Sequence, residues 1–335
     1  MLPIAMVTGA SLYLIYHFMP EPVHRAGPLL SGIVGVMQPL LIFLMLFFTF
    51  CGIEPRQLKP HRWHWWLLLV QGGVFTLAGL SAWALRDLLS SGTYILMECL
   101  MLCFICPTAT AAAVVTRKLG GDIPGITTYI VLINIMAAVL VPLIVPVVRP
   151  EAGVSFGTAF SMILAKVFPL LMTPCLCAWL VRYLMPRLLR RILRYPDQPF
   201  YLWTVALTLA IAVTTKSIMK TQLDHGLLLG MASVSLVSCF VQFALGRRIG
   251  QTLPPRYHSS DDASSVGAVK EINKITAGQS MGQKNTVFAI WMGYTFMTPE
   301  TAIVGGLYSI WHNIYNSWQL RRAGKDTISA VRKYR

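Results

Sequence analysis

The chain has 335 residues, of which 55% are hydrophobic and 12% are charged, and its mean hydropathy is +0.61. Because the apolar residues come in long runs, these values exclude an ordinary water-soluble protein. The net charge of +15 does not indicate a nucleic-acid partner, because the basic residues lie in loops beside the apolar runs, where they set membrane orientation. We therefore predict an all-α, multi-pass protein whose partner is the lipid bilayer and which binds no nucleic acid.

Ten segments are predicted to cross the bilayer, since a spanning helix needs roughly 20 residues. In chain order they cover residues 2–19, 28–50, 64–84, 92–116, 124–148, 155–181, 199–217, 226–246, 264–297 and 300–320. The first lacks the charged start and the cleavage site of a signal peptide, so we expect it to be retained as a helix. Residues 1–335 thus form a single membrane domain.

The basic residues indicate the orientation of the chain. They concentrate in the loops after the second, fourth, sixth and eighth crossings and in the tail 321–335. By the positive-inside rule these loops, the basic tail and both termini are cytoplasmic, and we expect a bacterial inner membrane. With five crossings in each half, the second half is inverted relative to the first. This predicts two inverted repeats, residues 1–148 and 155–320.

Two crossings are interrupted by residues that do not suit the interior of a membrane helix. Residues 279–285 place two glutamines, a lysine, an asparagine and a glycine between apolar runs, and the next run, 286–297, is too short to span. In the first half, the apolar run 98–106 ends at Pro107, which removes a backbone donor. We predict that crossings four and nine are broken helices, interrupted near Pro107 and Gly282, which is typical of a transporter's binding site. Two ordinary kinked helices are the alternative.

Several segments resemble motifs of the bile acid:sodium symporter family. They are CPTATAAAVVT at 106–116 followed by Gly121 and Asp122, SMGQKN at 280–285, YSIWHN at 308–313, and the end of the second crossing around Cys51-Gly52-Ile53. The resemblance runs through nearly the whole chain in order. It implies a core of crossings three to five and eight to ten, in which the broken crossings four and nine cross each other near Pro107 and Gly282. It also implies a panel of crossings one, two, six and seven. It also implies a substrate between core and panel, exposed to each side in turn as the core moves.

The sequence departs from this family at the residues that bind sodium there. The family's Ser-Asn pair in crossing four corresponds to Ala112-Ala113, its glutamate in crossing nine to Ser280, and its glutamine to Lys284. Hard cations need oxygen ligands, so we do not expect sodium coupling. No metal or other cofactor is expected, and a proton is left open as the coupling ion.

Three further positions that bind sodium in the family lie in crossings three and five. The family's hydroxyl ligands in crossing five correspond to Ile126 and Ile130, although Thr127 and Thr128 are adjacent. The glutamine of crossing three is kept as Gln71. A symporter that binds sodium through unusual ligands therefore remains an alternative.

Lys284 is a charged residue inside a predicted crossing, and it is the most distinctive feature of the sequence. A charged side chain at the bilayer centre costs about 2.5–3.5 kcal/mol on insertion scales, so another interaction must offset it. We interpret Lys284 as a tethered cation in the place of a sodium ion, with its ammonium near Gln71 and backbone carbonyls. The alternative is a lysine that extends toward the cytoplasm or forms a structural salt bridge.

Two more charged residues lie within predicted crossings. Lys166 is near the middle of crossing six, where it either holds an anionic group of the substrate or pairs with Glu98. Glu98 lies in the outer half of crossing four, where it either takes part in proton transfer or belongs to a satisfied ion pair. The two interpretations stay open for each residue.

Polar side chains at the breaks and in the last crossing complete the candidate set. We assign substrate binding to Lys284, Lys166, Thr108, Thr110, Gln283, Asn285, His312 and Asn313, and charge pairing or proton transfer to Glu98 and Gln71. Packing is the alternative for His312 and Asn313, and the cysteines, including the Cys103–Cys106 CxxC, are interpreted as small buried hydrophobes. No motif of a hydrolase, kinase or metalloprotease is present, so an enzyme is not expected.

These residues together predict a secondary transporter of a small organic anion that works by alternating access without sodium. The main alternative is a membrane protein that keeps the fold but only binds or senses its ligand. A channel is a third option.

Overall fold

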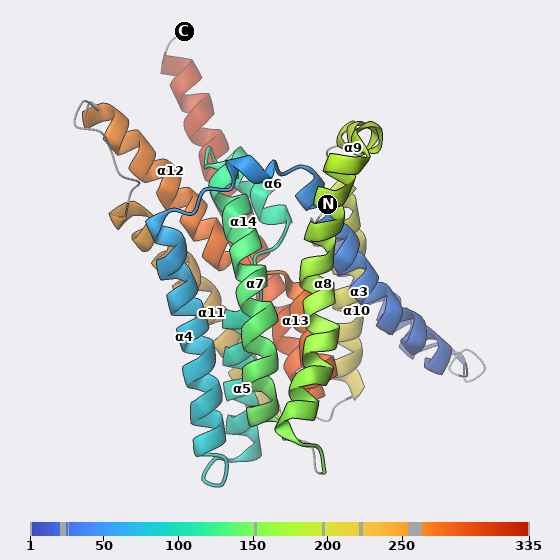
Figure 1. Ribbon diagram of the computed structural model, residues 1–335. Coiled ribbons are helices and arrows are strands. Elements are labelled where there is room, and N and C mark those ends of the chain that lie inside the picture. The colour runs from blue at the N-terminus through green and yellow to red at the C-terminus, as the bar shows by residue number, and fades with distance from the viewer. Residues whose placement is uncertain are drawn as a thin grey trace.

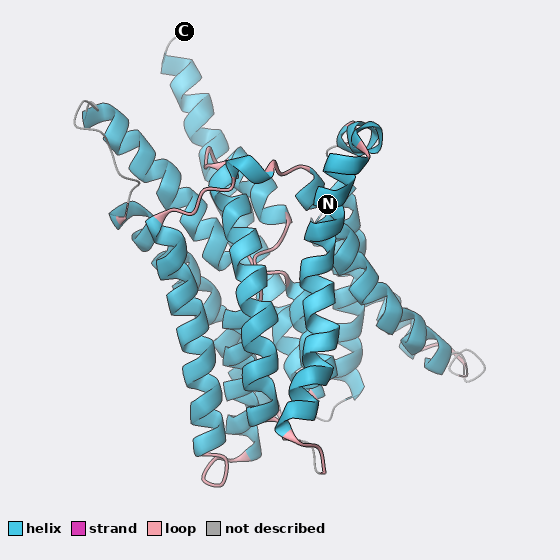
Figure 2. Cartoon of the chain, viewed as in Figure 1, coloured by secondary structure: helices cyan, strands magenta, loops and turns pink. Residues whose placement is uncertain are grey.

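The computed structural model describes residues 2–20, 25, 27–150, 153–195, 198–220, 224–253 and 263–333. Within these ranges the chain is helical and has no strand, as Figure 2 shows, so the predicted all-α class is confirmed. The elements in order are α1 (Leu2–His17), α3 (Gly27–Cys51), η1 (Pro55–Gln57), α4 (Arg62–Ala84), α5 (Ser91–Ile105), α6 (Ala111–Lys118), α7 (Ile123–Val148), α8 (Phe156–Leu184), α9 (Pro186–Leu193), α10 (Gln198–Lys220), α11 (His225–Thr252), α12 (Ala263–Gly282), α13 (Thr286–Phe296), η2 (Pro299–Thr301) and α14 (Ala302–Lys333).

Among the described residues, six helices are long and apolar enough to span a bilayer by themselves. They are α3, α4, α7, α8, α10 and α11, while α1, α5 and α13 are apolar but shorter. The chain is therefore an integral, multi-pass membrane protein. The count of ten crossings stays a prediction, because the remaining segments are short, broken or partly polar.

The helices pack into two groups that meet at α7 and α8. In one group α1 packs on α10, and α3 lies against both α8 and α10. In the other, α11 packs along α12 and α14, and α4 packs along α5 and α7. Figure 1 shows α13 in the middle of the molecule, and it contacts α14 of one group and both α3 and α10 of the other.

The contact between α11 and α12 depends on two glycines. A Cβ atom at Gly246 would lie 2.5 Å from the carbonyl oxygen of Ala277, and one at Gly250 would lie 2.4 Å from that of Asn273. Small residues let membrane helices approach closely, and any larger residue at these positions would push the helices apart. This contact sets the position of α12, which leads into the second helix break.

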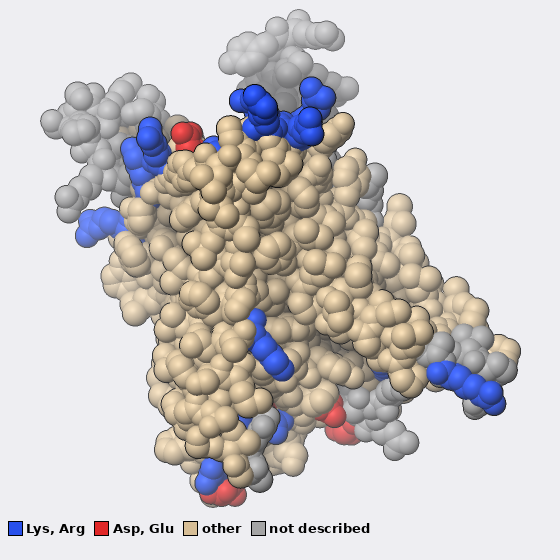
Figure 3. Space-filling model, turned by 45° about the vertical axis from the view of Figure 1, so that its right-hand side comes forward, with Lys and Arg blue, Asp and Glu red and all other residues tan. Residues whose placement is uncertain are grey.

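The positive charge gathers at one end of the molecule, which we call the basic end. Arg117 and Lys118 end α6, and Arg190 and Arg191 end α9. Figure 1 places α6 and α9 at the upper end together with both chain termini, and Figure 3 shows Lys and Arg side chains gathered there above a largely uncharged face. We call the other end, with the loop between α4 and α5, the opposite end.

Candidate functional site

The two predicted helix breaks lie against each other and share backbone hydrogen bonds. Helix α5 ends at Ile105 and α6 begins at Ala111, while α12 ends at Gly282 and α13 begins at Thr286. Thr108 and Lys284 form an isolated antiparallel bridge. The Ala109 amide donates to the carbonyl of Gln283 over 2.9 Å, and the Asn285 amide donates to that of Pro107 over 2.8 Å. The predicted breaks near Pro107 and Gly282 therefore exist, and they meet at what we call the crossover.

Side chains satisfy other backbone groups that the breaks set free. The Thr108 hydroxyl donates to the carbonyl of Ser280 over 2.5 Å, and the Tyr308 hydroxyl donates to that of Gly282 over 2.9 Å. Asn285 caps α13, since its Oδ1 accepts from the amide of Phe288. Irregular backbone at membrane depth is stable only where such partners replace the helical bonds. Thr108 and Asn285 thus have a structural role in addition to the binding role predicted for them.

Lys284 is enclosed by protein at the crossover, with 2% of its surface exposed. Its Nζ donates to the carbonyl oxygen of Phe104 over 3.4 Å, so the expected backbone-carbonyl partner is present. Among the described residues no acidic side chain pairs with it. A small cavity adjoins it, lined by residues of α5, α13 and α14 that include Leu102, Thr286 and Val304.

Three cysteine side chains lie near this ammonium, and no sequence pattern predicted that placement. Cys103 and Cys106 come from α5 and Cys239 from α11, and all three lie close enough to Lys284 to interact with its charge. Cys106 also donates to the carbonyl of Asn285 over 2.8 Å. The cysteines are buried, as predicted for small hydrophobes, but they form the immediate surroundings of the one lysine at the crossover.

Gln71 belongs to a buried network that supports the crossover from α4. Its Nε2 donates to Oε1 of Gln242 over 3.0 Å and approaches the carbonyl of Met281 at 3.5 Å, while its Oε1 accepts from the Tyr129 hydroxyl. Gln242 donates onward to the hydroxyl of Tyr308 over 3.3 Å. Gln71 therefore bonds to neighbouring polar groups rather than to Lys284.

The positions that the resemblance assigns to sodium offer few ligands in three dimensions. Ala112, Ile126 and Ile130 are fully buried and carry no side-chain oxygen. The adjacent Thr127 and Thr128 do not replace them, because both hydroxyls donate to carbonyls one turn earlier in α7, that of Pro124 among them. No cluster of three or more His, Cys, Asp or Glu side chains fit for a metal occurs in the described part of the chain. Ala112, Ile126 and Ile130 therefore supply no side-chain oxygen to a cation.

Lys166 lies away from the crossover. It is exposed on α8, and its Nζ stands 5.6 Å from the centroid of the Phe296 ring in a cation–π contact. Phe296 ends α13, about 15 Å along the helix from the crossover at 1.5 Å per residue. The structure therefore does not bring Lys166 and Lys284 together, and the ion pair considered between Lys166 and Glu98 is wrong.

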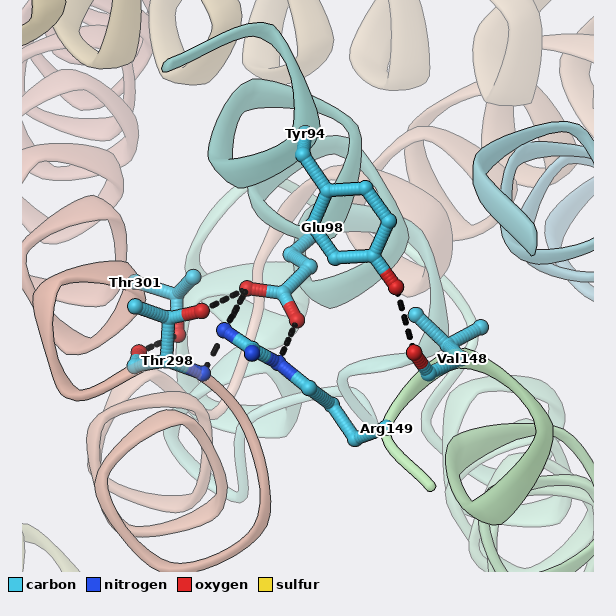
Figure 4. Close-up of polar contacts among 6 residues, drawn as sticks. All are labelled: Tyr94, Glu98, Val148, Arg149, Thr298 and Thr301. Carbon is cyan, nitrogen blue, oxygen red and sulfur yellow. Dashed lines mark hydrogen bonds and ion pairs between the residues drawn. The ribbon is translucent and has the colours of Figure 1, made fainter. Parts of the chain in front are cut away.

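Glu98 is paired with Arg149, which the sequence analysis did not consider. Figure 4 shows the buried carboxylate held from two sides: Arg149 Nε lies 2.5 Å and Nη2 3.3 Å from its oxygens, and the Thr298 hydroxyl donates over 2.5 Å. Tyr94 stacks beside the guanidinium and donates its hydroxyl to the carbonyl of Val148. Glu98 therefore belongs to a satisfied ion pair, and its contacts join α5, the end of α7 and the loop after α13.

The other predicted residues lie in the two breaks and on α14, and several have no hydrogen-bond partner in the described part of the chain. Both amide atoms of Gln283, both ring nitrogens of His312 and Oδ1 of Asn313 are buried without a hydrogen-bond partner among the described residues. Thr110 is 4% exposed and does not cap α6. These side chains remain available to a bound molecule or to water.

Residues 39–223 match the family model described as the sodium bile acid symporter family. The match covers more than half of the chain, from the middle of α3 through α10, and includes the first helix break. No match to the chain was found among curated proteins.

Proposed function

Because the chain belongs to the sodium bile acid symporter family, we propose that it is a secondary transporter of a small organic anion that works by alternating access without sodium. The family consists of membrane transporters for small molecules rather than of enzymes. Two properties are proposed beyond family membership. Transport does not need sodium, and the substrate carries a negative charge.

The proposed transport unit follows from the two packed groups of helices. We assign α4 to α7 and α11 to α14 to a core, and α1, α3, α8 and α10 to a panel. The broken helices α5–α6 and α12–α13 occupy corresponding places in residues 1–148 and 155–320, which we propose to be inverted repeats. The substrate would bind between core and panel, and a movement of the core against the panel would expose it to each side.

Lys284 carries the proposal of sodium independence. Its ammonium would place a positive charge at the crossover, with the Phe104 carbonyl as a hydrogen-bond acceptor, where the family's sodium-binding glutamine would stand. In a sodium-coupled carrier the ion must bind before the crossover has its full charge. A tethered ammonium would supply that charge without a bound ion, so the core could move without a sodium gradient. Transport would then be facilitative or linked to protons.

The charge balance supports an anionic substrate. Glu98 is committed to Arg149, so it neutralises neither Lys166 nor Lys284. Lys166 is exposed, faces the end of α13 and has no acidic partner among the described residues. A carboxylate or sulfonate would complement this charge through a charge-assisted hydrogen bond, which is stronger in a poorly hydrated cleft than at an open surface.

The test is a counterflow assay with the purified protein in proteoliposomes. Vesicles loaded with an unlabelled organic anion are diluted into the same labelled anion, with a panel of carboxylates and sulfonates tested in turn, in sodium and then in potassium buffer. We expect exchange of at least one anion at equal rates in both buffers. Binding without exchange would favour the sensor alternative, and exchange that needs sodium would contradict the role given to Lys284.

A further inference from the structure

A short helix, α9, lies across the end of α8 at the basic end of the molecule. Helix α8 ends at Leu184, Met185 leaves the helical conformation, and Pro186 starts α9. A proline suits the first turn of a helix, so the chain turns here and begins a new helix. Figure 1 shows α9 almost end-on, whereas α8 runs along the page, so the two axes cross. Helix α9 packs on both α8 and α3.

The position of α9 corresponds to the headgroup level of a bilayer. Helix α8 has 29 residues. A helix of that length is about 43 Å long, which reaches from one headgroup layer to the other. Helix α3 ends at the same level, because Arg182 near the end of α8 donates over 2.8 Å to the carbonyl of Cys51, the last residue of α3. A helix that crosses the ends of two spanning helices lies along the membrane surface.

Helix α9 has one basic face and one apolar face. With about 3.6 residues per turn, four exposed arginines fall within about 100° of its circumference. They are Arg187, Arg190, Arg191 and Arg194. The centre of the apolar face is covered by protein, since Leu189 is 7% exposed. Leu188 and Leu193 at the edges of that face are 36% and 43% exposed. An amphipathic helix of this kind is typical of proteins that bind the membrane surface.

The charges and the exposed leucines of α9 suit one kind of partner. The arginines have no acidic partner among the described residues. Arg190 lies one turn before Leu193, and Arg191 one turn after Leu188, so an arginine stands beside each exposed leucine. A guanidinium binds a phosphate group through two parallel hydrogen bonds, and a leucine at headgroup level meets the acyl chains. Anionic phospholipids offer the phosphate, the net negative charge and the acyl chains together.

We propose that α9 is a membrane-surface helix that binds the headgroups of anionic phospholipids through its four arginines, with Leu188 and Leu193 against the acyl chains. Its position at headgroup level favours a lipid over an acidic protein in solution. Because α9 packs on α3 and α8, which belong to the proposed panel, a bound lipid would hold this end of the panel to the membrane. The proposal does not depend on which anion is transported, or on whether transport occurs.

The first experiment measures lipid binding to the purified full-length protein by native mass spectrometry. Phosphatidylglycerol and phosphatidylcholine with the same acyl chains are titrated in turn, and the fraction of protein with a bound lipid is followed. We expect the wild type to bind the anionic lipid about tenfold more tightly, since juxtamembrane arginines attract anionic headgroups. Equal binding of the two lipids would overturn the proposal.

The double variant Arg190→Gln with Arg191→Gln should bind phosphatidylglycerol at least about tenfold more weakly than the wild type. Arg190→Lys with Arg191→Lys should keep most of the affinity, because the positive charge remains. Arg117→Gln with Lys118→Gln is the matched control. It removes two charges from the same end of the molecule, but from α6, which has no exposed apolar side chain. The control should bind as the wild type does, and an equal loss in both glutamine variants would show that affinity follows overall charge and would overturn the site.

The second experiment uses the wild-type protein and so does not depend on the folding of a variant. Amide hydrogen exchange is compared between nanodiscs of phosphatidylcholine alone and nanodiscs that also contain phosphatidylglycerol. We expect exchange in residues 186–194 to slow several-fold when the anionic lipid is present, because a bound headgroup holds α9 on the membrane. Exchange in residues 111–118 of α6 should stay the same. No change in α9, or an equal change in both helices, would contradict a lipid site on α9.

Discussion

Thr108 and Lys284 pair as an antiparallel bridge, so each helix break supplies the backbone partners that the other needs. The side chains of the two residues serve different purposes. The Thr108 hydroxyl donates to the carbonyl of Ser280 and thus binds the breaks together, while the Lys284 ammonium points to α5 and places a positive charge there. Removing the Thr108 hydroxyl should therefore lower the stability of the crossover, whereas removing the Lys284 ammonium should change its charge.

Sodium should have no effect on the wild-type protein. Replacing sodium by potassium at constant ionic strength should change neither anion exchange nor the thermal unfolding temperature in detergent. Lys284→Gln restores the family's residue at that position, but it should not create sodium dependence, because Ala112, Ile126 and Ile130 still lack oxygen ligands. A rise in unfolding temperature that is specific to sodium in the wild type would contradict the tethered-cation interpretation.

Lys166→Ala should weaken binding of organic anions, since it removes a cation that has no acidic partner. Lys166→Arg should keep part of the affinity because the charge remains. We expect a loss of about tenfold for the alanine variant, which corresponds to about 1.4 kcal/mol, a reasonable value for one charged hydrogen bond. Lys118→Ala at the basic end is the control and should bind as the wild type does. If all three variants bind alike, Lys166 does not contact the substrate.

Of the acidic residues in the ion pairs described here, Glu98 should be the one whose replacement by alanine lowers thermal stability most. The replacement leaves Arg149 and the Thr298 hydroxyl without their acceptor in a buried setting. Breaking a buried pair costs about 3–5 kcal/mol, and we expect about 2–3 kcal/mol because Arg149 is partly exposed and can reach water.

Asp87→Ala is the matched control for Glu98→Ala, because it breaks the exposed pair with Arg86, whose atoms lie 3.7 Å apart. Exposed pairs contribute about 0–1 kcal/mol, so the unfolding temperature should barely change. Thermal unfolding of both variants in the same detergent checks the comparison. Equal effects would mean that Glu98 is not held as Figure 4 shows.

Thr108→Val should destabilise the protein by about 1–2 kcal/mol, because it keeps the side-chain shape but removes the donor to a carbonyl at the helix break. Thr215→Val is the control. The Thr215 hydroxyl donates to the Ile211 carbonyl one turn earlier in its own helix, so its loss should cost less. Thermal unfolding measures both, and a larger effect at Thr215 would contradict the structural role given to Thr108.

The helix breaks could be predicted from the sequence because their cause is local. A proline and a group of polar residues inside apolar runs cannot continue a membrane helix, and the run after the second break was too short to span. The structure accordingly has α13 at Thr286–Phe296, close to the predicted 286–297. The all-helical class followed in the same way from the long apolar runs.

The partners of the charged residues could not be predicted, because they depend on how distant helices are rotated and packed. Sequence spacing allowed Glu98 to pair with Lys166, but Arg149 at the end of α7 is the residue that reaches it. The thiols of Cys103 and Cys239 come from helices separated in the chain, and only their packing brings them to Lys284. Gln242 gave no local signal of its link to Gln71.

The ion pair and the hydrogen bond of Glu98 also bear on the order in which contacts form during synthesis. Arg149 follows Glu98 by 51 residues, but Thr298 follows it by 200. At a synthesis rate of about 5–20 residues per second, the threonine leaves the ribosome about 10–40 s after the carboxylate. The first break is made almost as long before the segment that it bonds to, because the carbonyl of Pro107 accepts from the amide of Asn285. We therefore expect the nascent first half to lack these hydrogen bonds until the second half has been made.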